Sequence, residues 1–385
     1  MVCRSGPDRG GWGTSMHVVM TVNAAWNIWN FRRDLVAALL AEGHDITVAA
    51  PPDDSVAELE ALGCRFIPLK MSAQSLSPVE GMKLRAQYKD LFRSQRPDIV
   101  LSYTIKNNIF GAMAARACRV PFIPNVTGLG TAFLSGGILQ FVAEGLYRQA
   151  FSQLPVVFFQ NRDDRDLFLA RGIIRADQAR LLPGSGIDLR RFAAAAYADD
   201  AEATIFLMIG RLLRDKGVRE FVDAARMVRR HRPDAQFRLL GAVDAANRTA
   251  IDRETVARWE REGVVEYLGV QPDVRPSIAA AHCVVLPSYR EGAPRTLIEA
   301  AAMARPLIAT DVPGCRDVVD HGNTGFLCEP GDAASLAAAC QTFLSLPRET
   351  RAAMGRAGRA RMAAAFDQTI VLDAYRKAMA EMTAG

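Results

Sequence analysis

Short apolar segments alternate with segments of helical periodicity along the chain. The apolar runs of the first half predict strands at His17–Val22, Asp45–Ala50, Arg65–Pro68, Asp98–Ser102, Phe122–Val126, Val156–Gln160 and Leu181–Ser185. Apolar residues at helical spacing predict helices between them, at Asn30–Glu42, Ser55–Leu62, Gly81–Ser94, Asn107–Ala117 and from about Asp163 onward. This alternation is typical of a parallel sheet wrapped by helices.

The same alternation begins again after residue 203. Strands are predicted at Thr204–Ile209, Gln236–Leu240, Val264–Leu268, Cys283–Pro287, Leu307–Thr310 and Gly325–Cys328. Helices are predicted at Val218–His231, Arg253–Glu262, Val274–Ala281, Pro294–Met303, Ala333–Leu346 and Gln368–Met382. The fold class is therefore α/β, with two Rossmann-like parallel-sheet domains. Ligands of such folds bind at the carboxyl ends of the strands, here in the cleft expected between the domains.

The length of 385 residues exceeds what one hydrophobic core supports, so two domains are expected. We predict an N-terminal domain at residues 16–185, a linker at 186–203 and a C-terminal domain at 204–365. A C-terminal helix at 366–385 is expected to cross back. Residues 1–15 are polar and rich in glycine, so we expect a flexible extension, with Met16 a candidate for the natural start.

Composition indicates a folded protein with reduced cysteines. Half of the residues are hydrophobic and 23% are charged, as in an ordinary core-forming chain. The seven cysteines are scattered, without a CxxC pair or clustered histidines, which argues against a zinc site and against a disulfide framework. We therefore expect a reducing compartment, the cytoplasm.

One uncharged window, Val120–Ala143, is long enough for a membrane-spanning helix. Proline, glycine and polar residues interrupt it repeatedly, however. The pattern favours a buried strand, then a glycine-rich loop, then a helix.

The first candidate site follows the predicted strand Thr204–Ile209. It reads Gly210-Arg211-Leu212-Leu213-Arg214-Asp215-Lys216-Gly217. Cations flanked by glycines at the carboxyl end of a strand suit a diphosphate, although the spacing is not that of a Walker loop. Taken alone, the motif fits a solvated basic turn equally well.

The second candidate site follows the predicted strand Cys283–Pro287. It reads Arg290-Glu291-Gly292-Ala293-Pro294-Arg295-Thr296-Leu297-Ile298-Glu299-Ala300. Pro294 suits the first position of a helix, so Glu291 is expected in the loop and Glu299 inside the helix. The N–H groups of that helix would suit a phosphate, and carboxylates can accept hydrogen bonds from vicinal hydroxyls. The alternative is that both carboxylates are structural, Glu291 favouring the helix dipole.

The second half resembles the retaining glycosyltransferases of family 4, which have the GT-B fold. Their E-x7-E motif matches Glu291 and Glu299, and their G-R-x4-K-G signature matches residues 210–217. The runs at residues 309–314 and 322–327 are also similar to theirs. In the first half, residues 104–111 and 127–130 look like a subgroup that builds glycans on polyprenyl-diphosphate carriers, including bacterial N-acetylgalactosaminyltransferases.

The resemblance implies roles for individual residues. Arg211 and Lys216 would bind the donor diphosphate and stabilise its charge as it leaves. Glu291 would contact the hydroxyls of the donor sugar, and Glu299 the ribose. The residues expected to bind the donor are Arg211, Lys216, Glu291, Gly292, Ala293, Arg295, Thr296 and Glu299.

The implied function is retaining transfer of a hexose or N-acetylhexosamine from a UDP-sugar to a polyprenyl-diphosphate-linked saccharide in bacterial surface polysaccharide or glycan synthesis. The resemblance implies that the N-terminal domain binds the acceptor and the C-terminal domain the nucleotide-sugar. Alternatives are a nucleotide-sugar epimerase or hydrolase of the same fold and a non-catalytic two-domain sugar-binding protein. No cofactor or metal is expected. Asp164-Arg165-Asp166 spells the DxD metal motif of another transferase fold, but its acidic residues suit the start of a helix. His282 and His321 lie beside apolar runs and are expected to be structural.

Positive charge in the first half suggests contact with an anionic membrane. Residues 1–195 hold 22 of the 47 Lys and Arg residues and 17 of the 42 Asp and Glu residues, which accounts for the whole net charge of +5. Between Lys83 and Arg119, eight cations stand against Asp90 and Asp98. The predicted helix Gly81–Ser94 carries several of them and five large apolar residues, namely Met82, Leu84, Tyr88, Leu91 and Phe92. Either this helix lies at the membrane surface, or its apolar stripe packs on the sheet.

Overall fold

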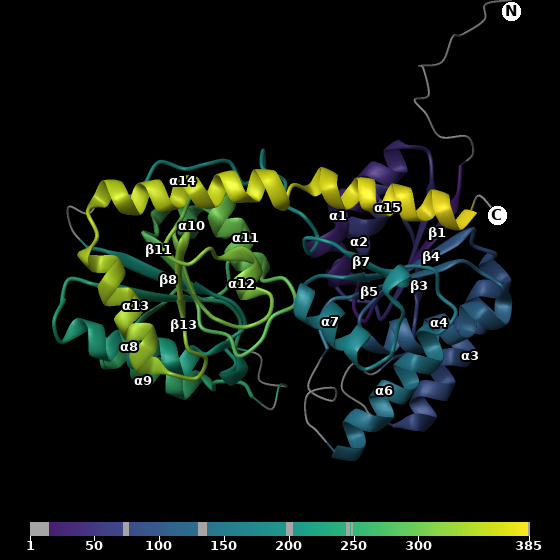
Figure 1. Cartoon of the computed structure of the whole chain (residues 1–385), viewed down its shortest axis with the longest axis horizontal. Coiled ribbons are helices and arrows are strands. Elements are labelled where there is room, and N and C mark those ends of the chain that lie inside the picture. The colour runs from purple at the N-terminus through teal and green to yellow at the C-terminus, as the bar shows by residue number, and fades with distance from the viewer. Residues whose placement is uncertain are drawn as a thin grey trace, which may run out of the picture. The chain divides into compact units, whose positions relative to one another are not determined.

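The computed structural model describes residues 15–71, 77–129, 137–197, 203–243, 247 and 249–383. It divides into two compact units, which are described separately (Figure 1). The N-terminal unit comprises the chain up to Gln160, residues Asp164–Ser185 and the segment from Leu372 onward. The C-terminal unit comprises Asn161–Asp163 and Gly186–Val371. The extension predicted at residues 1–15 lies outside the described residues, except for Ser15.

The N-terminal unit is built on a parallel sheet of seven strands in the order β3-β2-β1-β4-β5-β6-β7. Their bounds are β1 His17–Thr21, β2 Asp45–Ala50, β3 Arg65–Pro68, β4 Ile99–Tyr103, β5 Phe122–Val126, β6 Val157–Phe159 and β7 Ala179–Leu181. The order reverses between β1 and β4, which pair in register from Val18 opposite Ile99 to Thr21 opposite Ser102. Such a reversal opens a crevice at the carboxyl ends of the two strands.

Helices cover both faces of this sheet (Figure 1). Their bounds are α1 Ala25–Ala41, α2 Val56–Leu62, α3 Pro78–Gln95, α4 Ile105–Cys118, α6 Gly137–Phe151 and α7 Arg162–Ala170. The apolar window at 120–143 thus holds strand β5 and the start of α6, as predicted, and the loop predicted between them lies mostly outside the described residues. None of the described helices combines the length and hydrophobicity needed to cross a bilayer.

The apolar stripe of α3 packs into the core, so that part of the membrane hypothesis is wrong. Leu84, Tyr88, Leu91 and Phe92 are all buried among side chains of α4 and the sheet. Burying them against the sheet gains about 1.5–3 kcal/mol for each large apolar side chain. Of the five residues named, only Met82 stays exposed.

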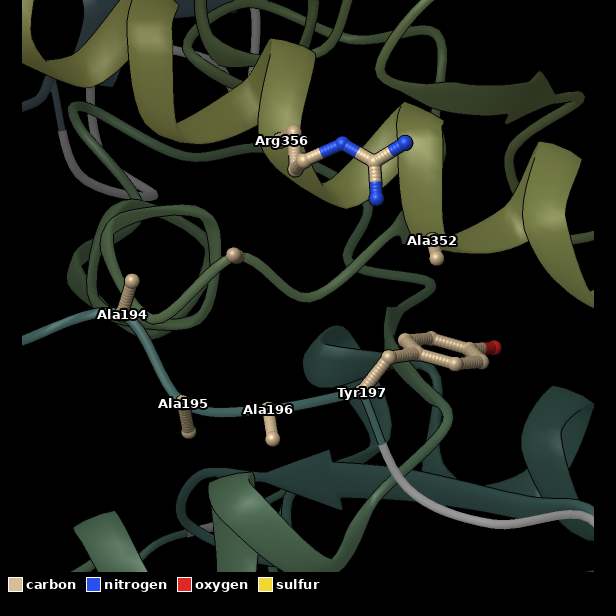
Figure 2. Close-up of a pocket in the computed structure, with 7 residues that line it drawn as sticks. Ala194, Ala195, Ala196, Tyr197, Ala352 and Arg356 are labelled. Carbon is tan, nitrogen blue, oxygen red and sulfur yellow. The ribbon is translucent and has the colours of Figure 1, made fainter.

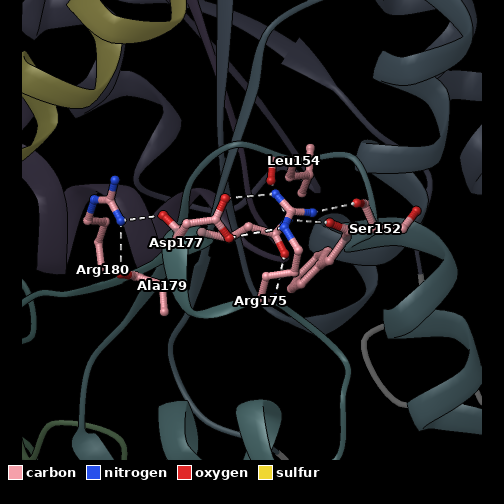
Figure 3. Close-up of polar contacts among 8 residues, drawn as sticks. Ser152, Leu154, Arg175, Asp177, Ala179 and Arg180 are labelled. Carbon is pink, nitrogen blue, oxygen red and sulfur yellow. Dashed lines mark hydrogen bonds and ion pairs between the residues drawn. The ribbon is translucent and has the colours of Figure 1, made fainter.

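The last strand of the N-terminal sheet begins earlier than predicted. It covers Ala179–Leu181 instead of Leu181–Ser185, after a single 3-10 turn, η1, at Ala176–Gln178. Arg175 braces this turn by donating to Asp177 and to the carbonyl of Ser152 (Figure 3). Gln178, which is buried, also donates to the carbonyl of Phe151 at 2.9 Å. Contacts to the end of α6 therefore set the position of β7, and local apolar pattern cannot predict them.

The C-terminal unit has a parallel sheet of six strands in the order β10-β9-β8-β11-β12-β13. The bounds are β8 Ile205–Ile209, β9 Gln236–Leu240, β10 Glu266–Tyr267, β11 Cys283–Leu286, β12 Leu307–Thr310 and β13 Gly325–Cys328. Here the order reverses between β8 and β11, which are paired neighbours. Each of the two sheets thus has one reversal point, as in a doubly wound fold.

Two layers of helices enclose the C-terminal sheet (Figure 1). Their bounds are α8 Val218–Arg229, α9 Arg253–Arg261, α10 Arg275–Ala280, α11 Arg295–Ala302, α12 Cys315–Val318, α13 Ala333–Ser345 and α14 Arg348–Ala365. One buried cluster joins α8, α9 and α13 to the sheet, and another joins α10, α11, α12 and α14.

Helix α14 was not predicted, because its sequence lacks a clear apolar stripe and contains glycines. Gly355 sits where a Cβ would lie 2.1 Å from the carbonyl oxygen of Ala304, so only glycine allows this close approach. Its place in the helix is therefore explained by packing against the end of α11 rather than by helix propensity.

The segments at the two ends of the C-terminal unit make packing contacts that local sequence does not predict. Ile187 and Phe192, in the stretch predicted as a linker, are buried in the core of this unit. The last helix, α15 Gln368–Thr383, belongs from Leu372 onward to the N-terminal unit. There Tyr375 accepts a hydrogen bond from the Asn125 amide at 2.9 Å, and Arg376 donates to Glu42 at 3.0 Å.

Candidate active site

Both motifs predicted for the donor meet at the reversal point of the C-terminal sheet. Residues 210–217 follow β8, and residues 287–294 follow β11. Because β8 and β11 are parallel neighbours, their carboxyl ends lie at the same edge of the sheet. This edge is where a doubly wound sheet binds its ligand.

An ion pair joins the two motifs. The ammonium of Lys216, in the 3-10 turn η2 (Arg214–Lys216), lies 2.5 Å from Oε1 of Glu291. Ser288 donates its hydroxyl hydrogen to the same oxygen at 2.6 Å. The side chain of Glu291 is 12% exposed and that of Lys216 is 26% exposed. A half-buried lysine and a fixed carboxylate therefore stand together at the edge of the sheet.

The main chain holds the two loops in close contact. Gly217 has φ 74°, and a Cβ there would lie 2.0 Å from the carbonyl oxygen of Pro287. Tyr289 donates its backbone N–H to the carbonyl of Asp215 at 3.0 Å and its hydroxyl to Glu220 at 2.7 Å. Glycine at 217 is thus required both by its backbone conformation and by the approach of the next loop.

A third loop, after β12, supports the loop that carries Glu291. Gly314 has φ 79°, and a Cβ there would lie 2.7 Å from the carbonyl oxygen of Gly292 and 2.8 Å from that of Glu291. The backbone N–H of Glu291 donates to the carbonyl of Pro313 at 3.3 Å. The run at residues 309–314, noted in the sequence for its resemblance, therefore packs directly against the carboxylate loop.

Helix α11 begins one residue later than predicted, because Pro294 is its N-cap with φ −74° and ψ 95°. Thr296 donates its hydroxyl hydrogen to the carbonyl of Ile209, which fixes the first turn of α11 against the end of β8. Nε of Arg295 lies 2.6 Å from Oε1 of Glu299. Burial raises the pKa of Glu299, and the guanidinium of Arg295 opposes that shift.

The remaining predicted residues lie in the same loops. Arg211 follows Gly210 directly after β8 and is exposed, and Gly292 and Ala293 lie between Glu291 and the cap of α11. Sequence reasoning did not select Ser288. It is fully buried, and its own carbonyl accepts a hydrogen bond from Thr310. A polar residue directly after a buried strand was the signal that could have identified it.

Replacing Gly217 with alanine is expected to destabilise the C-terminal unit by on the order of 2 kcal/mol and to weaken nucleotide binding. The reason is that the added Cβ must displace Pro287 and the loop that carries Glu291. Gly263→Ala is the matched control, since Gly263 has φ 66° but nothing lies within 4 Å of the position that its Cβ would take. Thermal unfolding and calorimetry with UDP measure both effects. Equal behaviour of the two variants would contradict the role given to the close approach.

The N-terminal unit carries a polar cluster at the equivalent edge of its own sheet. Thr104 follows β4 with φ 69° and ψ 154°, a conformation rare for a β-branched residue. The buried Asn107 donates to the hydroxyl of Thr104 at 2.7 Å, and the buried Asn108 donates to the carbonyl of Asn125 at 2.8 Å. Strained backbone of this kind concentrates at functional sites, so this edge is a second candidate binding site.

A separate hollow in the C-terminal unit carries no comparable chemistry (Figure 2). Ala194, Ala195 and Ala196 line it together with Tyr197, Ala304, Ala352 and Arg356. Arg356 is paired with Glu349 at 2.6 Å. Five of the seven lining residues are alanines, so we assign no chemistry to this hollow.

The DxD run and the two histidines, which the sequence analysis excluded from the active site, make contacts within the fold. In the DxD run, Asp164 is buried within α7 and Asp166 pairs with the adjacent Arg165. His282 accepts a hydrogen bond from the backbone of Ile205, and His321 accepts one from Leu327. Within the described part of the chain, no three His, Cys, Asp or Glu residues are grouped as metal ligands would be.

Two family models match the chain, one in each half. Residues 28–185 match the glycosyl transferase 4-like domain, and residues 203–345 match the glycosyl transferases group 1. The first match ends at residue 185, where the N-terminal unit gives way to the C-terminal unit, and the second match lies within the C-terminal unit.

Two curated relatives and one solved structure extend these matches. The chain is 26% identical over 379 residues to N,N'-diacetylbacillosaminyl-diphospho-undecaprenol alpha-1,3-N-acetylgalactosaminyltransferase of Campylobacter jejuni, covering 94% of this chain and 98% of the relative. It is 25% identical to UDP-Gal:alpha-D-GlcNAc-diphosphoundecaprenol alpha-1,3-galactosyltransferase of Escherichia coli, over 68% of this chain and 70% of the relative. Its fold matches Anabaena Alr3699/HepE in complex with UDP and glucose, with a TM-score of 0.77, 18% identity and coverage of 95% and 99%.

The two parallel sheets and the family matches define an enzyme, a glycosyltransferase with the GT-B fold. Residues 203–345 form a domain of the glycosyl transferases group 1, and residues 28–185 form a glycosyl transferase 4-like domain. The prediction of a GT-B glycosyltransferase is therefore confirmed, and the alternative of a non-catalytic sugar-binding protein is ruled out.

Proposed function

We propose that the enzyme transfers a hexose or N-acetylhexosamine from a UDP-sugar to a polyprenyl-diphosphate-linked saccharide in bacterial surface glycan synthesis. The observation that carries this proposal is the similarity over nearly the whole length of both chains to a transferase whose named acceptor is a diphospho-undecaprenol glycan. A second relative is named for the same kind of acceptor and for a UDP-sugar donor. The complex of Alr3699/HepE with UDP and glucose supports a UDP-sugar on this fold.

The charges at the reversal point of the C-terminal sheet suit a nucleotide diphosphate. Lys216 and Arg211 bind the diphosphate and stabilise the charge that develops as it leaves. Glu291 forms an ion pair with Lys216, so a diphosphate bound by Lys216 competes with Glu291 for the ammonium. Glu291 then accepts hydrogen bonds from the hydroxyls of the donor sugar, and Glu299 from the ribose. Gly292, Ala293, Arg295 and Thr296 lie beside these groups and complete the donor-binding set.

Catalysis in this proposal rests on positioning and electrostatic stabilisation, and the anomeric configuration of the donor sugar is retained. The acceptor binds at the carboxyl edge of the N-terminal sheet. The enzyme acts from the cytoplasmic side, in peripheral contact with the inner face of the cell membrane.

Two measurements in sequence test the proposal. A panel of UDP-, GDP- and ADP-sugars is first screened for protection against thermal unfolding, because a ligand of the native state raises its stability. The stabilising donor is then supplied with an undecaprenyl-diphosphate-linked N-acetylhexosamine, and the linkage of the product is determined by NMR. We expect protection by a UDP-sugar and an α-linked product. Protection by GDP- or ADP-sugars alone would overturn the donor assignment. Release of the free sugar, or epimerisation of the donor without transfer, would favour the hydrolase or epimerase alternative.

Transfer is expected to survive removal of divalent metal, because Lys216 and Arg211 supply the positive charge that a metal ion would otherwise bring to the diphosphate. The measurement is transfer activity after dialysis against EDTA, compared with the same sample after addition of Mn²⁺ or Mg²⁺. Loss of activity in EDTA and recovery with Mn²⁺ would contradict the metal-free mechanism and would return attention to Asp164 and Asp166.

A further inference from the structure

Exposed apolar side chains gather at one edge of the N-terminal unit. Met82 is 64% exposed and Val79 is 53% exposed, both in the first turns of α3. Phe141 is 76% exposed and Val142 is 49% exposed, both near the start of α6. These four residues, here called the apolar rim, include the two most exposed large apolar side chains of this unit among the described residues.

The topology places the two parts of the rim at the same edge. Helices α3, α4 and α6 each follow a parallel strand and return to the next, so each begins at the carboxyl edge of the sheet (Figure 1). The start of α3 packs on the start of α4, since Gly81 lies against the ring of Phe110. The end of α4 contacts the end of α6, where Arg116 donates to the carbonyl of Gln149 at 3.1 Å. The three helices therefore run side by side in the same direction.

The rim is accompanied by positive charge. Lys83 and Arg85 are exposed on the second turn of α3, and Lys106 lies half-buried in the first turn of α4. Glu80, which is also exposed, is the acidic group that faces Lys106 in this region. Exposed apolar side chains beside cations match a bilayer surface that carries anionic headgroups.

We infer that the apolar rim, with Lys83 and Arg85, is the surface by which the enzyme docks on an anionic membrane. This inference rests on the proposed function, because a polyprenyl-linked acceptor is held in the bilayer and the rim lies at the edge of the sheet assigned to that acceptor. It replaces the membrane surface predicted from the apolar stripe of α3, because all residues of that stripe except Met82 are buried. Val79, Met82, Phe141 and Val142 enter the interface, while Lys83 and Arg85 contact lipid phosphates.

Vesicle co-sedimentation of the full-length enzyme tests the surface. Wild-type enzyme is expected to bind phosphatidylcholine vesicles that contain phosphatidylglycerol, and binding should fall as salt rises. The Met82→Ser/Phe141→Ser variant should bind these vesicles about tenfold more weakly, because two apolar side chains no longer enter the bilayer. Met227→Ser is the matched control, since Met227 is 36% exposed on α8 of the other unit, and its binding should not change.

The charged part is tested by Lys83→Glu/Arg85→Glu, with Arg93→Glu/Arg96→Glu at the far end of the same helix as control, so that both variants change the charge by −4. The first variant should lose most binding to anionic vesicles, and the control should lose little. Equal loss in both would mean that net charge alone drives binding, which would overturn the assigned surface. The assigned surface would also be overturned if the Met82→Ser/Phe141→Ser variant bound vesicles as tightly as the wild type. A change in the oligomeric state of that variant would show the rim to be a protein interface and would overturn the assignment too.

Donor binding is measured in parallel by calorimetry with UDP, and transfer is measured with a water-soluble short-chain acceptor. Neither should change in the rim variants, whereas transfer to the polyprenyl-linked acceptor in vesicles should fall. If the rim variants lose vesicle binding but wild-type enzyme neither binds UDP nor transfers sugar, the proposed function fails and the surface stands. If transfer proceeds as proposed and vesicle binding is unchanged in the variants, the surface fails alone.

Discussion

The Glu291→Gln variant is expected to lose about a hundredfold or more in turnover without any loss of affinity for UDP. Glutamine keeps the size of the side chain and can still accept from Ser288, but it lacks the charge that strengthens hydrogen bonds from the sugar hydroxyls in the transition state. The UDP moiety does not contact Glu291 in the proposed arrangement. Moreover, the substitution removes the carboxylate that competes with the diphosphate for Lys216.

The matched comparison is Glu299→Gln, the same chemical change eight residues later in the chain. Because Glu299 is assigned to the ribose, this variant should weaken binding of UDP itself and raise the KM for the donor. Steady-state kinetics give kcat and KM, and calorimetry with UDP gives the affinity. If Glu291→Gln weakens UDP and Glu299→Gln leaves it unchanged, the two assignments are reversed.

The Lys216→Ala and Arg211→Ala variants are each expected to weaken UDP binding by roughly 1.5–3 kcal/mol, or about ten- to a hundredfold. Each loses a charge-assisted contact with the diphosphate. Turnover should fall as well, because the same charge stabilises the leaving diphosphate. Arg230→Ala is the control. Arg230 is an exposed cation at the far end of α8, so its substitution removes the same charge at a position away from the site.

A double variant separates the loss of phosphate contact from the loss of the ion pair. Lys216→Ala leaves Glu291 without the ammonium, and this half-buried carboxylate then repels the diphosphate. Lys216→Ala/Glu291→Gln should therefore bind UDP more tightly than Lys216→Ala alone. Wild-type UDP affinity in both Lys216→Ala and Arg211→Ala would refute the assignment of the diphosphate site.

The sequence was sufficient for the order and type of nearly all elements, since the central parallel strands are buried on both faces and read as short apolar runs. Strands β2, β3, β5, β9, β12 and β13 have the predicted bounds. Prediction from the sequence failed where contacts between residues distant in the chain determine the bounds or the existence of an element. Contacts with the end of α6 set the start of β7, and α14 tolerates Gly355 only because that residue meets the carbonyl of Ala304.

The same division applies to the site. Local sequence determined that Lys216 and Glu291 would each follow a strand, because charged residues that interrupt an apolar run mark the end of a buried segment. Only the tertiary structure decided that β8 and β11 are neighbours, which brings the ammonium and the carboxylate to 2.5 Å and adds Ser288 as a second donor to Glu291. It also decided which face of α3 is free, burying Leu84 and Tyr88 and leaving Met82 in solvent. Helical periodicity identifies an apolar stripe, but strand order and the packing of neighbouring helices determine whether that stripe or the opposite face meets the core.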